Sequence, residues 1–182
     1  SNNSLYGINL YFSNGNTISR NTASSNSFDG IDLYSSTGNT ISDNTASNNS
    51  QCGIYLYSAS NSNNIMGNTA DGNANCGVRL DSSTGNTISG ETISSNTIHG
   101  IYLDSSPDNT ISGNTASDND NCGIFLISSD NNTVTDNAAD DSKFGIYILS
   151  STDNTISGNT ATDNFDGIMI SSSVGNTISS NT

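Results

Sequence analysis

The sequence predicts an all-β fold, a single-stranded right-handed parallel β-helix (a β-solenoid) of about eight coils. Two markers, Gly-Ile-x-Leu and Asn-Thr-Ile, alternate along the whole chain, and each returns every 22 to 24 residues. Within a repeat, apolar and polar residues alternate with a period of two, which is the period of a strand. A single repeat cannot bury its own apolar residues, so neighbouring repeats must stack. Parallel crossovers favour the right-handed coil.

Each coil is expected to contain three short strands separated by turns rich in Asn, Gly and Ser. In the repeat that begins at Gly30, the alternation turns Ile31, Leu33, Ile41 and Ala46 inward. Coils stacked at roughly 4.8 Å would make a rod about 40 Å long. Equivalent Asn residues would form a hydrogen-bonded ladder at one corner, which satisfies polar groups there. This corner column comprises Asn16, Asn39, Asn63, Asn86, Asn109, Asn132, Asn154 and Asn176.

Composition agrees with one solenoid domain over residues 1–182, with no internal boundary and no obvious caps. Only 31% of the residues are hydrophobic, which would favour disorder in a chain without repeats. A solenoid, however, needs only a thin apolar column in each coil. The net charge of −14, with only three basic residues, argues against a nucleic-acid partner. No stretch is apolar and long enough to span a membrane.

The repeat, as in Gly30-Ile31-Asp32-Leu33 and Asn39-Thr40-Ile41, resembles the parallel β-helix repeat of the carbohydrate-binding and sugar-hydrolase type. It is most similar to NosD-like proteins and to Asn/Ser/Thr-rich β-helix proteins of archaeal, especially methanogen, cell surfaces or sheaths. The resemblance covers the whole chain and implies an extracellular or cell-surface location. It implies little about activity, because this group includes enzymes, binding modules and structural rods. NosD-like proteins are linked to copper-site maturation, but the sequence has no His-rich or Met-rich cluster.

The repeat spacing predicts contacts between the ends of neighbouring molecules. The chain length equals a whole number of coils, and bare solenoid ends expose open strand edges. We therefore expect end-to-end stacking into a fibre, or a slice of a longer solenoid. The residues expected at this contact are Ser1, Asn2, Asn3, Leu5, Ile178, Asn181 and Thr182.

The outward residues of the Gly-Ile-x-Leu strands predict a lateral interface. An exposed apolar patch is unusual on an isolated monomer, and one is formed here by Phe125, Ile127, Tyr147, Leu149 and Met169. Four tyrosines toward the N-terminus either stack on sugar rings or pair with one another across strands, and we favour an interface for them too. They are Tyr11, Tyr34, Tyr55 and Tyr57.

A second group of outward residues offers weak catalytic candidates. Asp81 and Asp104 are expected on adjacent rungs, about 5 Å apart, with Arg79 beside them. Two carboxylates at that separation suit a retaining glycosidase, and with Arg79 they are also similar to polysaccharide lyases of this fold. Asp is common throughout the chain, so a solvated polar face is an equally simple interpretation.

Three cysteines and the single histidine precede marker glycines in successive coils. Cys52 and Cys76 are expected one rung apart, close enough for a disulfide, and Cys122 would remain for a cross-link to another chain. Packed free thiols are the other interpretation. A zinc site formed by Cys76, His99 and Cys122 is disfavoured because its outer ligands would lie two rungs apart, roughly 9.6 Å.

The leading functional hypothesis is a non-enzymatic, self-assembling structural protein of a cell-surface layer, sheath or fibre, with itself as partner. The alternatives are a carbohydrate-binding module or a polysaccharide lyase or hydrolase, for which cell-surface glycans are the partners. A lesser alternative is ice binding, because outward Thr-x-Ser pairs resemble the threonine arrays of ice-binding solenoids. We expect no cofactor; stacked Asp residues leave calcium open, but no calcium-binding loop motif occurs.

Overall fold

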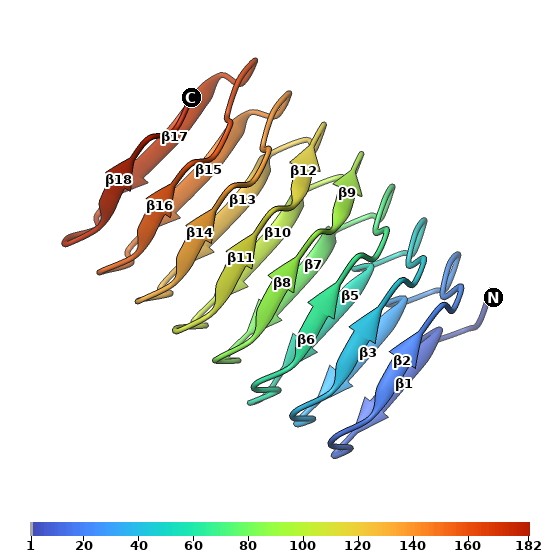
Figure 1. The fold of residues 1–182 in the computed structure, drawn as a ribbon. Coiled ribbons are helices and arrows are strands. Elements are labelled where there is room, and N and C mark those ends of the chain that lie inside the picture. Colours follow the sequence, from blue (N-terminus) through green and yellow to red (C-terminus); the bar gives the residue numbers. More distant parts are fainter. Residues whose placement is uncertain (1) are drawn as a thin grey trace.

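The structure, a computed structural model that describes residues 2–182, is a parallel β-helix (Figure 1). One eight-stranded parallel sheet, sheet A, is built from the Gly-Ile-x-Leu segments. Its strands, in order, are β1 (Ile8–Tyr11), β3 (Ile31–Tyr34), β5 (Ile54–Tyr57), β7 (Cys76–Asp81), β10 (His99–Asp104), β13 (Cys122–Ile127), β15 (Phe144–Leu149) and β17 (Asp166–Ser171).

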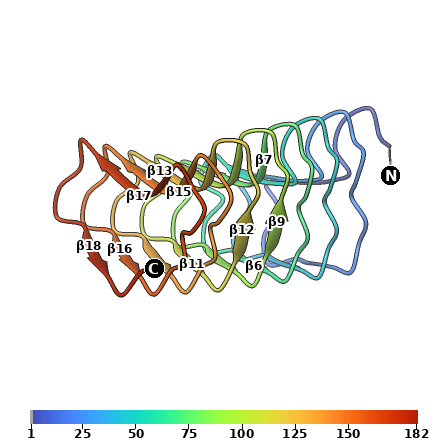
Figure 2. The same cartoon turned by 90° about the horizontal axis from the view of Figure 1, so that it is seen from above.

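A second eight-stranded parallel sheet, sheet B, is built from the Asn-Thr-Ile segments and lies in front of sheet A in Figure 1. Its strands, in order, are β2 (Thr17–Ser19), β4 (Thr40–Ser42), β6 (Asn64–Met66), β8 (Thr87–Ser89), β11 (Thr110–Ser112), β14 (Thr133–Thr135), β16 (Thr155–Ser157) and β18 (Thr177–Ser179). Seen from above, successive coils lie side by side along one axis (Figure 2). Eight strands on one face enclose seven complete turns.

The third predicted strand is regular in only two coils, as β9 (Thr92–Ser94) and β12 (Thr115–Ser117). In other coils it is reduced to isolated parallel bridges, such as Thr22 to Thr45. This third face is short because a buried Asn corner lies on either side of it, for example Asn44 and Asn49. The position of the third strand is therefore confirmed, although its length is shorter than that of the other two.

The core is the inward column predicted from the alternation. Ile31, Leu33 and Ile41 are fully buried, as is Ala46. The register keeps each of them beside its equivalent in the next coil; Ile31, for example, pairs with Ile54. Burial of each such side chain contributes roughly 1.5–3 kcal/mol, so a few apolar residues per coil suffice when every coil repeats them.

The predicted corner ladder of asparagines is confirmed. Asn39 Oδ1 accepts hydrogen bonds from both the backbone N–H and the side-chain amide of Asn16, and Asn39 bonds Asn63 in the same way. Two further Asn columns mark the other corners of the coil, as shown by the bonds from Asn44 to Asn68 and from Asn49 to Asn73. These ladders satisfy buried polar groups that the strands alone would leave without partners.

Glu91 takes the place of an Asn in the column that contains Asn44 and Asn68, and it is 1% exposed. Its Oε1 accepts two hydrogen bonds from Asn68, but its Oε2 is buried and has no partner among the described residues. In the next coil, the equivalent Asn114 donates its amide to the carbonyl of Ile88. A carboxylate has no such donor, and burial raises the pKa of Glu91 to about 8. Glu91 is therefore protonated at neutral pH.

The marker glycine is required by close backbone approach. A Cβ added to Gly53 would lie 2.7 Å from the carbonyl oxygens of Ala46 and Gly77. That separation is too short for carbon against oxygen, so this corner of the coil admits only glycine.

Candidate functional site

The outward side chains of sheet A form a continuous stack, which we call the aromatic ladder. Arg79 lies between two rings, with its guanidinium carbon 5.1 Å from the centroids of both Tyr55 and Tyr102. Tyr102 stacks on Phe125 at 5.3 Å, and Phe125 stacks on Tyr147 at 5.0 Å. The in-register pairing of equivalent strand positions produces this stack. Because the rings stack on one another, their faces are covered by neighbouring rings and their edges are the part left accessible.

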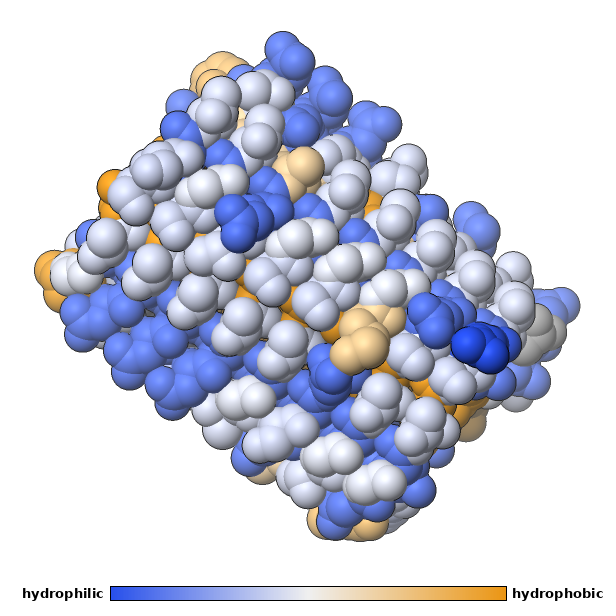
Figure 3. All heavy atoms as spheres, viewed as in Figure 1, coloured by the Kyte–Doolittle hydropathy of each residue, from blue (hydrophilic) through white to orange (hydrophobic). Residues whose placement is uncertain are grey.

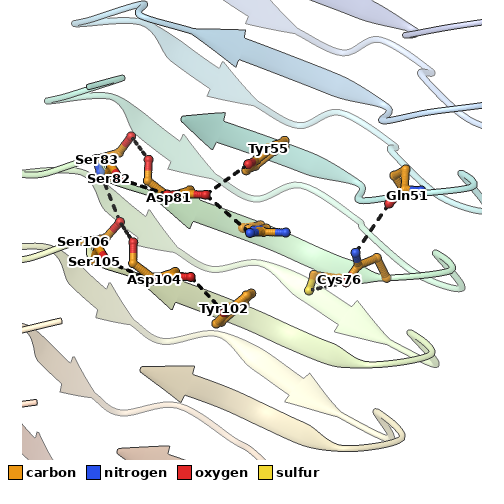
Figure 4. Close-up of polar contacts among 12 residues, drawn as sticks. Gln51, Tyr55, Cys76, Asp81, Ser82, Ser83, Tyr102, Asp104, Ser105 and Ser106 are labelled. Atoms are coloured by element: carbon orange, nitrogen blue, oxygen red, sulfur yellow. Dashed lines mark hydrogen bonds and ion pairs between the residues drawn. The ribbon is translucent and has the colours of Figure 1, made fainter. Parts of the chain in front are cut away.

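The predicted carboxylate pair lies beside this ladder. Asp81 and Asp104 are direct register partners on β7 and β10 (Figure 4). Asp81 Oδ2 lies 3.4 Å from Arg79 and accepts a hydrogen bond from the hydroxyl of Tyr55 at 3.4 Å. Asp104 Oδ2 accepts one from the hydroxyl of Tyr102 at 3.2 Å. The structure therefore brings the weak catalytic candidates together.

Both carboxylates are already occupied by partners within the chain. The Oδ1 atoms of Asp81 and Asp104 accept hydrogen bonds from Ser82 and Ser105, each at 2.9 Å. With a partner on every oxygen, this pair orients the ladder side chains. It does not present an oxygen that is free for proton transfer.

A pocket of about 380 Å³ opens at one end of the aromatic ladder, over the first coils of sheet A. Its walls include the rings of Tyr6, Phe28, Tyr55 and Tyr57, and Arg79 lines the side nearest the ladder. Pockets of this size and of mixed aromatic and polar lining are typical of small-molecule sites.

Two carboxyl groups line this pocket, and the sequence analysis did not single them out as site residues. Asp29 Oδ1 accepts a hydrogen bond from the backbone N–H of Cys52 at 2.7 Å. Asp32 Oδ2 accepts one from Asn9 at 2.8 Å, whereas its Oδ1 is buried without a partner among the described residues. The alternation turned Asp32 outward, yet it is only 1% exposed because neighbouring side chains cover it.

Both of these carboxyls resist ionisation. Burial, and then the nearby charge of Asp29, raises the pKa of Asp32 to about 7. Burial also raises the pKa of Asp29, although the N–H of Cys52 opposes that effect. A pair of carboxyls that holds a proton near neutral pH, in a pocket, is a common feature of acid–base sites. The sequence offered one signal for these two residues. Asp29 and Asp32 stand at repeat positions that apolar, aromatic or thiol side chains mainly occupy in the other coils.

The three cysteines are buried and free. In this structure Cys52 and Cys76 are separate thiols, which is the packed-thiol alternative, and Cys122 is 1% exposed. Burial raises the pKa of Cys122 to about 12, so it remains a thiol. His99 pairs with Cys76 and Cys122 in register, as predicted, but its buried ring packs on the ring of Tyr102 at 5.1 Å.

The predicted interface residues are stacked side by side and do not form a freely exposed patch. The patch residues are half-buried along sheet A: Phe125, Ile127, Tyr147, Leu149 and Met169. Tyr11 is 64% exposed, and Tyr34 stacks on it at 5.1 Å. At the two ends of the rod, Leu5 and Ile178 are 53% and 47% exposed. Ser1 lies outside the described residues.

Two protein families match the chain. Residues 1–93 match the family described as the right-handed β-helix region. Residues 72–182 match the family described as periplasmic copper-binding protein (NosD). No curated protein matches the chain.

The described residues do not fit a copper site. Within residues 2–182, no group of three or more His, Cys, Asp or Glu side chains is placed to hold a metal ion. The buried thiols favour their protonated form, whereas metal ligation needs the thiolate. Along the same residues, no helix is long and apolar enough to cross a membrane.

The solved structures with a similar fold include alginate epimerases. The periplasmic alginate epimerase AlgG is 24% identical with a TM-score of 0.92, over 97% of this chain and 47% of that one. The A-module of the mannuronan C-5 epimerase AlgE4 from Azotobacter vinelandii is 20% identical with a TM-score of 0.74, over 90% of this chain and 53% of that one. The chain thus spans about half the length of these enzymes.

These comparisons overturn the leading functional prediction. A non-enzymatic, self-assembling structural protein is wrong, because the structural neighbours are epimerases of polysaccharides and favour the carbohydrate-active alternative. They also give no support to a sheath, a filament or an archaeal origin. The family matches and the solenoid topology show that the chain belongs to the right-handed β-helix proteins of the NosD type.

Proposed function

We propose that this protein is an exported, carbohydrate-active β-helix that binds a polysaccharide along the outer face of sheet A and modifies it there. The observation that carries the proposal is the aromatic ladder, which ends at a pocket containing two carboxyls. The periplasmic location of AlgG and of the proteins for which the NosD family is named supports export.

The dimensions of the ladder support binding of an extended chain. Its members recur once per coil in register along the parallel sheet, as Tyr55, Arg79, Tyr102, Phe125 and Tyr147. The stacked rings offer apolar edges, and the hydroxyl oxygens of Tyr55 and Tyr102, which donate their hydrogens to Asp81 and Asp104, can still accept hydrogen bonds from sugars. The pocket beside Arg79 would then receive one unit of the bound chain.

The two sheets provide a matched test of this proposal. Retention by immobilised polysaccharides, both acidic and neutral, should fall about tenfold or more on Tyr102→Ala, because the substitution removes the centre of the ladder. Tyr102→Phe, which keeps the ring, should retain most of the binding. Thr110→Ala changes an outward residue of the same coil on sheet B and should have no effect. Equal retention of wild type and Tyr102→Ala on every polysaccharide would refute binding by the ladder.

A further inference from the structure

Two buried polar atoms on the wall of the pocket over the first coils of sheet A have no partner. Among the described residues 2–182, five buried side-chain polar atoms lack a hydrogen bond, and two of them, Asp32 Oδ1 and Arg79 Nε, belong to residues that line this pocket. Asp32 is 1% exposed. Buried polar atoms of folded proteins nearly always have a partner, and leaving one unpaired costs free energy. The pocket therefore carries polar groups that a ligand would satisfy.

We propose that this pocket is a subsite for one uncharged sugar unit, and that Asp32 recognises the unit by donating a hydrogen bond from Oδ1 to a sugar oxygen. The inference rests on the carbohydrate-binding function proposed above and names the class of sugar that the pocket accepts. Asp32 binds the sugar in this role and takes no part in proton transfer.

The existing hydrogen bond of Asp32 decides which of its oxygens carries a proton. Oδ2 accepts a hydrogen bond from the amide of Asn9 at 2.8 Å, so Oδ2 is the acceptor. Burial, and then the charge of Asp29, raises the pKa of Asp32 to about 7, so the carboxyl holds a proton in mildly acidic solution. That proton lies on Oδ1, which makes Oδ1 a donor. Asp32 Oδ1–H and Arg79 Nε–H both need an acceptor, and a sugar ring carries several oxygens that accept hydrogen bonds.

The charges on the pocket wall select against a charged sugar. Asp29 is the ionised member of the carboxyl pair, because hydrogen bonds from the backbone and the thiol of Cys52 and from its own backbone oppose the effect of burial on its pKa. Arg79 is paired with Asp81 at 3.4 Å, so its charge is already offset. A uronate would meet the fixed charge of Asp29 without a free cation beside it. A cationic amino sugar would face a donor at Asp32 and a carboxylate at Asp29 whose partners are in place.

Aromatic rings complete the wall. Tyr55 and Tyr57 stack at 4.5 Å, and Tyr6 packs on Phe28 at 5.8 Å. Phe28 is 43% exposed, so part of its ring is open to the apolar C–H groups of a sugar. The volume of about 380 Å³ is at the small end of the range for ligand pockets, which suits a single ring.

The first test compares sugars that differ in charge. Glucose, galactose and mannose are used as methyl glycosides, each as the neutral sugar, the uronate and the amino sugar. They are titrated at pH 6 into the isotope-labelled full chain, and the amide resonances of Cys52 and Arg79 are followed. At least one neutral glycoside should shift both resonances and bind about tenfold or more tightly than its two charged counterparts.

Variants isolate the contribution of each wall. Asp32→Leu keeps a side chain of similar shape without Oδ1 and should weaken the neutral glycoside about tenfold or more. Asp32→Asn places an amide N–H where Oδ1 lies and should keep the affinity at pH 6. Phe28→Ala, which tests the pocket even if Asp32→Leu does not fold, should weaken binding about threefold or more. Phe165→Ala is the matched control: this ring occupies the same repeat position in the last coil, is 82% exposed, and should not affect binding.

The affinity should depend on pH through Asp32. Oδ1–H is lost as the pH rises through about 7, so the neutral glycoside should bind the wild type about tenfold more weakly at pH 8.5 than at pH 6. Asp32→Asn should show no such fall. Burial raises the pKa values of the tyrosines on the wall, and a hydrogen bond to Cys76, followed by burial, raises that of Cys52, so none of these groups titrates in this range. The titratable or charged groups that face Asp32 are Tyr6, Asp29, Cys52, Tyr55, Tyr57 and Arg79.

The outcomes separate this inference from the proposed function. Neutral glycosides that leave both resonances unmoved, or that bind no more tightly than the uronates, would refute the subsite. Unchanged affinity in a folded Asp32→Leu variant would refute the role of Asp32. In each of these cases, polysaccharide retention that is lost in Tyr102→Ala would still support the ladder. Glycoside binding in the pocket without retention of any polysaccharide would refute the proposed function and leave the subsite standing.

Discussion

Sheet A and sheet B enclose the same core, and each coil contributes one strand to each of them, yet their outer faces differ. The two outward positions of each sheet B strand are nearly the same in every coil, Thr at the first and Ser at the second, except for Asn64 and Met66 on β6 and Thr135 on β14. Viewed from that side, the surface shows rows of pale side chains of intermediate hydropathy (Figure 3). The outward positions of sheet A vary from coil to coil and carry the rings, Arg79 and the pocket. Regularity therefore marks the scaffold, and departure from it marks the candidate site.

The comparison implies that both sheets contribute equally to stability. Leu103 of β10 and Ile111 of β11 belong to the same coil and are fully buried. Leu103→Ala and Ile111→Ala should each lower the free energy of unfolding by about 2–5 kcal/mol, as measured by urea denaturation. A loss confined to one of the two variants would show that the sheets do not share one core.

The second prediction concerns the Asn column, where Glu91 breaks the repeat inside the scaffold. In the folded protein, burial raises the pKa of Glu91 from 4.5 to about 8, so the folded state binds more protons than the unfolded state between these values. The contribution of Glu91 to stability is therefore fully present below about pH 4.5. It is lost progressively as the pH rises to about 8.

Glu91→Gln removes this titration and adds an amide donor, as in the neighbouring Asn residues. At pH 9 the variant should be more stable than the wild type by about 1–3 kcal/mol, the cost of one unsatisfied buried polar group. At pH 5 the difference should be much smaller. Thermal unfolding at the two pH values checks this, and a difference that does not depend on pH would mean that Glu91 keeps one charge state throughout.

The smallest effect is expected on the outer face of sheet B. Thr110→Ala should change the free energy of unfolding by no more than about 0.5 kcal/mol, as is usual for surface positions. Double substitution with Thr133→Ala, its register partner on β14, should remain small. A loss above 1 kcal/mol would assign a structural role to this face.

The periodicity predicted the scaffold because each inward Ile, Leu, Ala and corner Asn recurs in every coil, so a local pattern defines a global structure. It also placed Asp81, Asp104 and Arg79 together, since register follows from the repeat. It missed the pocket, because no repeat-wide pattern marks Asp29 and Asp32 and their burial depends on which rings cover them. The cysteines show the same limit: the repeat placed Cys52 and Cys76 on adjacent rungs, but adjacency alone does not determine whether two thiols are joined.

The central claim, that carbohydrate binds to sheet A and not to sheet B, can be tested directly by titrating the isotope-labelled protein with an oligosaccharide and following its amide resonances. The account predicts shifts concentrated at Cys52, at Arg79 and along β7, β10 and β13, with sheet B strands β8, β11 and β14 unaffected. Shifts confined to the sheet B strands, or none on either sheet at saturating oligosaccharide, would contradict it.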